Sequence, residues 1–147
     1  MIDIKTAPFA ALLLRTSMGA MFIAHGLTKL LVFTPAGTAG YFMSLGLPAW
    51  LAYLVIVLEL AGGILLILGL RVRETSLALL PILAGASVLA HGGNGWMFAN
   101  EGGGWEFPVF WGAALLVQAL LGAGAYAVRS AHRPRTSSTL ARAARAA

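Results

Sequence analysis

The sequence contains no cysteine, so disulfides, thiolate metal ligands and a persulfide intermediate carried on this chain are excluded. Without cysteines, the sequence does not indicate whether the protein faces an oxidising or a reducing compartment. Charged residues are also scarce, at 10% of the chain, whereas soluble domains contain about 25%. Hydrophobic residues make up 59%, and the mean hydropathy is +0.85. This composition predicts an integral membrane protein without a separate soluble domain.

Acidic residues are few, the net charge is +5, and eight of the ten lysines and arginines lie outside the apolar runs. These residues all fall on one side of a four-pass arrangement: Lys5, Arg71, Arg73, Arg129, Arg133, Arg135, Arg142 and Arg145. The two loops on the opposite side contain no lysine or arginine. By the positive-inside rule both termini are cytoplasmic. The basic residues therefore indicate membrane topology, and we expect no nucleic-acid partner.

Long apolar runs occupy residues 8–33, 50–70, 75–93 and 105–128. Each is long enough to cross about 30 Å of hydrocarbon as a helix. The sequence thus predicts an all-α, integral membrane four-helix bundle over residues 1–128. We expect the first run to be a retained membrane helix rather than a cleaved signal peptide, and Pro81 to kink its helix without ending it. Residues 129–147 are predicted to form a disordered basic tail beside an anionic leaflet.

The run 50–70 contains a carboxylate, Glu59, near its middle. Its thirteen Leu, Ile and Val residues contribute about −0.3 to −0.6 kcal/mol each on the insertion scale, which outweighs the cost of about 2.5–3.5 kcal/mol for a central charge. The segment can insert despite Glu59. Ionisable groups inside membranes are rare, face protein or water, and usually have a partner. The sequence therefore predicts a basic partner for Glu59 on another helix.

Other ionisable residues lie in or beside the apolar runs. At about 1.5 Å per residue, His25 shares the depth of Glu59, and Lys29 lies one turn above His25 on the same face. The Lys29 side chain could reach down to Glu59 or up to the interface. We expect His25, Lys29, Glu59, His91 and Glu106 to converge in the outer half of the bundle. Arg15 lies about 15 Å nearer the cytoplasm than His25 and could extend inward.

Two interpretations of this cluster remain open. The ion pair could be a structural contact that only fixes helix register. Alternatively, several ionisable groups gather around a polar pocket open to the outer leaflet. A metal site is not expected, because the paired Glu-x-x-His motifs of di-iron bundles are missing and Lys29 would repel a cation.

Polar and glycine motifs occur in the following order over about residues 14–126: Arg15, His25-Gly26-x-x-Lys29, Leu45-Gly46-Leu47-Pro48, Glu59-Leu-x-Gly62-Gly63, Gly69-Leu70-x-x-Arg73, His91, Glu106 and Gly122-x-Gly124-x-Tyr126. In the order of these motifs the chain resembles the DoxX family of small four-helix bacterial membrane proteins. The resemblance implies a multi-pass protein of the bacterial cytoplasmic (inner) membrane. It also implies an association with quinone-linked redox work, and the family-like site positions are Arg15, His25, Lys29, Glu59, His91 and Glu106.

The leading hypothesis is a subunit or accessory factor of a membrane redox system that binds a quinone or a small lipophilic molecule between its helices. Glu59 would accept or pass protons, His25 or His91 would bond a carbonyl oxygen, and Lys29 would stabilise negative charge. Electrons would come from a redox partner protein or a soluble substrate. The alternative is a non-catalytic small-solute permease or a membrane scaffold. We expect the chain to contact the lipid bilayer and to associate with further copies of itself in a homo-oligomer.

Overall fold

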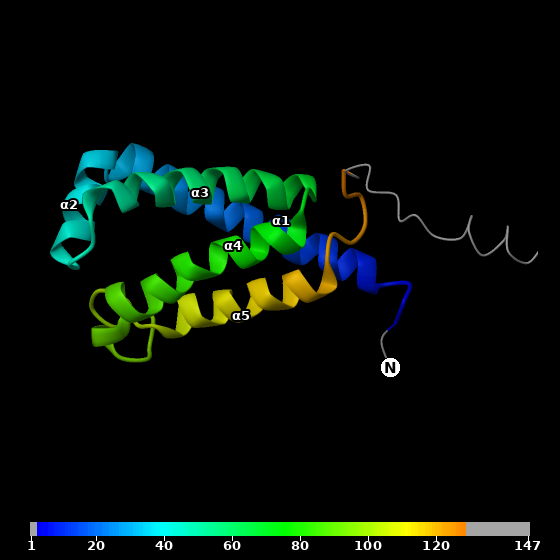
Figure 1. The fold of residues 1–147 in the computed structure, drawn as a ribbon. Coiled ribbons are helices and arrows are strands. Elements are labelled where there is room, and N and C mark those ends of the chain that lie inside the picture. Colours follow the sequence, from blue (N-terminus) through cyan, green and yellow to red (C-terminus); the bar gives the residue numbers. More distant parts are fainter. Residues whose placement is uncertain (1–2, 129–147) are drawn as a thin grey trace, which may run out of the picture.

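The computed structural model describes residues 3–128, and over that range its regular secondary structure consists of helices without strands (Figure 1). Its elements are α1 (Ala7–Leu27), the π-helical turn η1 (Thr28–Val32), α2 (Pro35–Ser44), α3 (Ala49–Leu68), α4 (Val72–Gly85), the π-helical turn η2 (Ala86–Ala90), the short 3₁₀ turn η3 (Gly92–Asn94) and α5 (Glu106–Leu121). The predicted all-α membrane bundle is confirmed. The predicted tail, residues 129–147, lies outside the described residues.

Three helical segments are long and apolar enough to cross a membrane: Ala7–Val32, Ala49–Leu68 and Val72–Ala90. The fourth, Glu106–Leu121, is shorter, at about 24 Å for its 16 residues. Many large apolar side chains on these helices are exposed, among them Leu13, Val57, Leu77, Phe110 and Leu120. In a membrane this surface contacts lipid instead of water, so its exposure carries no hydrophobic penalty.

The helices pack as two antiparallel hairpins, α1 with α3 and α4 with α5 (Figure 1). The α1–α3 contact is close because glycines meet at the crossing. A Cβ added to Gly19 would lie 2.6 Å from the carbonyl oxygen of Gly63, and a Cβ on Gly63 would lie 2.7 Å from the oxygen of Gly19. Small residues at such crossings are typical of membrane helices, where van der Waals contact drives association.

The core between the two hairpins is filled with apolar side chains. Its members are Met18, Phe22, Leu66, Val72, Leu79, Leu83, Trp111 and Leu115, all at most 6% exposed. Val128 donates to the carbonyl of Leu68 in the last turn of α3, and Ala125 donates to that of Pro8 at the start of α1. Both described ends of the chain therefore lie at the end of the bundle where α3 joins α4, beside Arg71 and Arg73. By the positive-inside rule this end faces the cytoplasm, and α2 and the α4–α5 loop face outward.

The outer connection between the first two long helices contains a helix that we had not predicted. Residues Pro35–Ser44 form α2, which begins at Thr34, whose Oγ1 accepts a hydrogen bond from the Gly37 amide, and has proline at its first position. A threonine cap followed by proline is a helix start signal. The segment's glycines and its lack of a regular apolar period concealed it.

The last helix ends earlier than predicted, at Leu121 rather than at 128. Gly122 and Gly124 have positive φ angles of 78° and 69°, which break the helix. The chain then continues as an irregular strap over residues 122–128. Its amides bond to other helices: Ala125 donates to the carbonyl of Pro8 and Val128 to that of Leu68. The strap thus ties α1, α3 and α5 together at the cytoplasmic end.

Candidate functional site

The Glu59 carboxylate is buried and paired. It projects from the middle of α3, about 15 Å from the outer end of that helix, and only 4% of its side chain is exposed. The Nζ atom of Lys29 donates to both carboxylate oxygens at 2.8 Å. Lys29 therefore reaches down into the membrane rather than up to the interface. Its backbone belongs to η1, a π-helical turn of a kind often found at functional sites.

His25 lies one turn before Lys29 and next to Gly26, where an added Cβ would lie 3.4 Å from the Cβ of Glu59. Its Nδ1 is 2.9 Å from the carbonyl oxygen of Met21. A carbonyl can only accept, so Nδ1 carries the hydrogen, and Nε2 of the neutral ring is left as an acceptor. The ring is exposed on one side and packs against Trp111 on the other, with 4.9 Å between ring centroids. His25 thus lies between the Lys29–Glu59 ion pair and the exposed surface at the contact of α1 with α5.

Trp111 is the site residue that the sequence reasoning missed. It lies on α5, is 4% exposed, and packs against Phe22 and Phe107 as well as His25. Its indole Nε1 is buried and has no hydrogen-bond partner among residues 3–128. One signal could have revealed it: Trp111 lies about 9 Å deeper than Trp105, below the interfacial belt where tryptophans usually gather.

His91 and Glu106 do not join this cluster, so the predicted convergence of five groups is wrong. The Nδ1–H of His91 is directed at the carbonyls of Gly102 and Gly103, at 3.2 and 3.0 Å. An oxygen of Glu106 accepts from the Phe98 amide at 2.9 Å. Both residues order the outer loop between α4 and α5. Depth estimates could not show this, because the loop folds back on its own backbone.

The outer loop is compact because its side chains and amides bond to carbonyls of the same loop. The side-chain amide of Asn94 donates to the carbonyls of Gly102 and Gly103. The amides of Trp105 and Glu106 donate to the carbonyls of Gly95 and Trp96. A Cβ on Gly104 would overlap several backbone carbonyls, those of Gly95, Trp96 and Met97. Most of the hydrogen bonds that hold the loop are therefore made within the loop itself.

Arg15 is buried rather than extended toward the cytoplasm. It is 1% exposed, and its guanidinium binds backbone carbonyls from α3 and from the strap. Nη1 donates to the carbonyl oxygens of Leu66, at 3.0 Å, and Ile67, while Nε and Nη2 donate to those of Ala123 and Ala125 at 2.8 and 2.9 Å. The α3 carbonyls belong to its last turn, where unpaired oxygens and the helix dipole favour a cation. Arg15 is thus a structural clamp at the cytoplasmic end.

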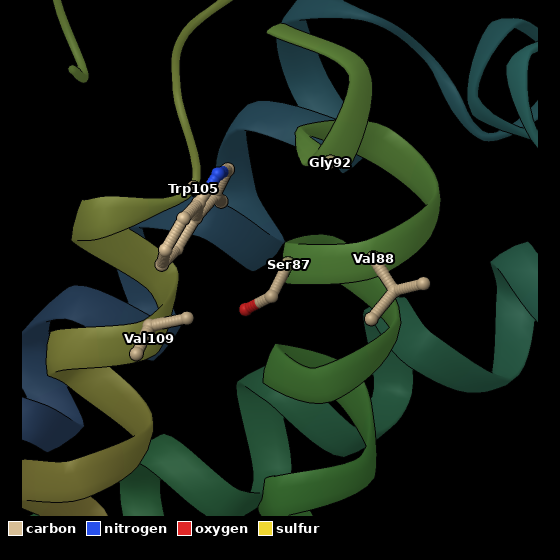
Figure 2. Close-up of a pocket in the computed structure, with 5 residues that line it drawn as sticks. All are labelled: Ser87, Val88, Gly92, Trp105 and Val109. Carbon is tan, nitrogen blue, oxygen red and sulfur yellow. The ribbon is translucent and has the colours of Figure 1, made fainter. Parts of the chain in front are cut away.

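A shallow open hollow lies elsewhere, between η2 and the start of α5. Figure 2 shows its lining: Ser87, Val88, Gly92, Trp105 and Val109. None of these residues is ionisable or belongs to α1 or α3. Val109 and Trp111 are about 200° apart around the α5 axis. The hollow therefore opens on a different side of α5 from the His25–Trp111 contact. Among residues 3–128, no three His, Asp or Glu side chains gather as metal ligands would.

Comparison with known proteins gives one family and several relatives. The family model described as DoxX matches residues 10–92. An uncharacterized protein of Haemophilus influenzae is 35% identical over 84% of this chain and 91% of its own length. The inner membrane protein YqjF of Escherichia coli is 32% identical over 84% of this chain and 92% of its own length.

A protein of Bacillus subtilis with the name "Putative oxidoreductase CatD" is 37% identical over 57% of this chain. The match covers 61% of that protein, less than two thirds of its length. No solved structure matches the chain.

Proposed function

This chain belongs to the DoxX family of membrane proteins and resides in the bacterial inner membrane, and on that premise we propose that it binds a quinone or a small lipophilic molecule as part of a membrane redox system. The proposed site consists of Glu59, Lys29 and His25. In this role the chain is a subunit or accessory factor, and a partner protein supplies the electrons.

The observation that carries the proposal is the ion pair buried at the depth of the membrane interior. Removing two charges from water costs several kcal/mol per ion, and apolar side chains would hold α1 against α3 without that cost. The Gly19–Gly63 contact already fixes this helix crossing closely. An ion pair retained in hydrocarbon is by default a functional-site hypothesis.

The residues present fit a quinone headgroup in their chemistry. A quinone supplies a carrier for two electrons and two protons when bound, and its carbonyl oxygens are hydrogen-bond acceptors. Lys29 offers an ammonium that could bond such an oxygen, and His25 offers an imidazole that can donate when protonated. Glu59 can hold or release a proton beside them. The apolar side chains of Phe22 and Leu66 exclude water from the inner side.

The relatives support the redox assignment only in general terms. The name of the Bacillus subtilis relative calls that protein an oxidoreductase. This chain has no cysteine that could carry electrons through a disulfide. We therefore propose that electrons reach the site from a redox partner protein.

The direct test is binding of menadione, a naphthoquinone without an isoprenoid tail, to the purified protein by equilibrium dialysis. Glu59→Gln and His25→Ala should each weaken binding at least about tenfold, since each removes a charged or hydrogen-bonding group. Matched controls are Glu106→Gln and His91→Ala, which change the same residue types in the outer loop. Equal affinity in all four variants would refute the proposed site.

A small-solute permease is less well supported. The core between the hairpins is closed by Phe22, Leu66, Leu79 and Leu115, each at most 2% exposed. Over residues 3–128, these four side chains belong to one packed apolar cluster between the hairpins. Solute flux in vesicles that contain only this protein would favour the permease. Copurification of a quinone-reducing enzyme from native membranes would favour the redox role over both the permease and a passive scaffold.

A further inference from the structure

The indole N–H of Trp111 is a buried donor without an acceptor in the described part of the chain. Trp111 is 4% exposed, and Nε1 finds no partner among the described residues. Buried tryptophans usually place this group against an acceptor. An unpaired buried donor costs the full loss of its hydration. A ligand with an acceptor atom could therefore form a hydrogen bond with this donor and recover part of that cost.

The surroundings of Trp111 define what could bind there. Its ring contacts are aromatic: Phe22 at 4.5 Å, His25 at 4.9 Å and Phe107 at 5.7 Å between centroids. Two of these neighbours, His25 and Phe107, are exposed, and they come from α1 and α5. These two exposed rings lie beside the buried indole on the lipid-facing side of the bundle. The indole is thus surrounded by flat rings, and its N–H has no partner among residues 3–128.

We propose that Trp111 positions the ligand by donating its indole N–H to an acceptor oxygen on a flat, largely apolar molecule. This inference rests on the proposed function and narrows its substrate class to planar carbonyl compounds. The His25 ring packs at an angle against the indole, and one turn farther along the chain Lys29 donates to Glu59. Trp111 binds the ligand and sets its orientation. The proton-bearing groups remain Glu59 and His25.

The experiment compares two probes that differ only in their oxygens. Menadione has two carbonyl groups, and methylnaphthalene has the same rings and methyl group without oxygen. In the wild-type protein menadione should bind more tightly. Trp111→Phe should reduce the ratio of the two affinities about five- to tenfold, the effect of one hydrogen bond to a buried donor. Trp105→Phe, on the same helix but in the hollow of Figure 2, should leave the ratio unchanged.

Because phenylalanine is smaller than tryptophan, Trp111→Phe could also change binding by leaving a cavity, so a second substitution serves as a control. Benzothienylalanine at position 111 keeps the shape of tryptophan and replaces only the N–H by sulfur, and it should reduce the ratio as Trp111→Phe does. If menadione binds, and Glu59→Gln weakens it, while both changes at Trp111 leave the ratio intact, the role of Trp111 is refuted and the proposed function stands. If menadione does not bind the wild-type protein, both are refuted.

Discussion

Removing either partner of the Lys29–Glu59 pair should destabilise the bundle, but by unequal amounts. The two side chains differ in exposure, 20% for Lys29 and 4% for Glu59. In Lys29→Met the carboxylate stays in the middle of α3 with no counter-charge. In Glu59→Gln the ammonium is left alone, but it stands on η1, only four residues from Phe33 at the outer end, and can turn to the interface.

These differences determine how much stability each substitution should cost. Leaving one charge of a buried pair uncompensated costs about 3–5 kcal/mol, and we expect this for Lys29→Met. For Glu59→Gln we expect about 1–2 kcal/mol, because the loss is mainly one charged hydrogen bond. The double variant Lys29→Met with Glu59→Gln should be more stable than Lys29→Met alone. The resulting coupling energy should be about 2 kcal/mol or more.

The free energy of unfolding in mixed detergent micelles, measured by titration with dodecyl sulfate, gives all four corners of this cycle. Helix content by circular dichroism reports the folded fraction. A coupling energy near zero, or a Glu59→Gln variant less stable than Lys29→Met, would refute the reasoning. Either result would mean that the pair does not hold Glu59 in the bundle.

Three further predictions concern the rest of the fold. Arg15→Met should lower the free energy of unfolding by about 3 kcal/mol or more, since carbonyls of α3 and of the strap lose their donor. Arg15→Lys should keep only part of the wild-type stability, because an ammonium lacks the planar fork of a guanidinium. The melting temperature in detergent measures the stability of both variants. Gly63→Ala should cost about 1–3 kcal/mol through overlap with α1, whereas Gly85→Ala, which meets open space, should cost nothing; an equal loss in both would contradict the close crossing. Gly104→Ala should loosen the outer loop and speed hydrogen exchange at residues 91–105, while Gly93→Ala should not; unchanged exchange in both would argue against the converging carbonyls.

The transmembrane architecture could be predicted from the sequence because its signals are local. Apolar length and the position of Arg71 and Arg73 require no knowledge of which helices touch. The Lys29–Glu59 contact was one of two predicted options. Depth estimates place Lys29 about one turn above Glu59, within reach of either the carboxylate or the interface, and the structure shows the first of these. Electrostatics then favours the nearest opposite charge in a medium of low dielectric constant.

The missed features depend on tertiary contacts. Arg15 is a clamp because α5 stops at Gly122 and the strap turns its carbonyls toward α1. His91 and Glu106 match His25 and Glu59 in residue type, but depth estimates place both of them nearer the outer boundary. Their partners are backbone groups of the same loop, which no pattern of side chains reveals. Glycine-rich loops of this kind conceal their own hydrogen bonds from sequence reasoning.

The most direct measurement of the central claim is photolabelling in membranes with an azido-quinone, followed by peptide mapping. The account predicts label on peptides that contain His25–Lys29 and Phe107–Trp111, competition by excess menadione, and loss of this label in Glu59→Gln. Label spread over the lipid-facing sides of all the helices, with no competition and no effect of Glu59→Gln, would contradict it.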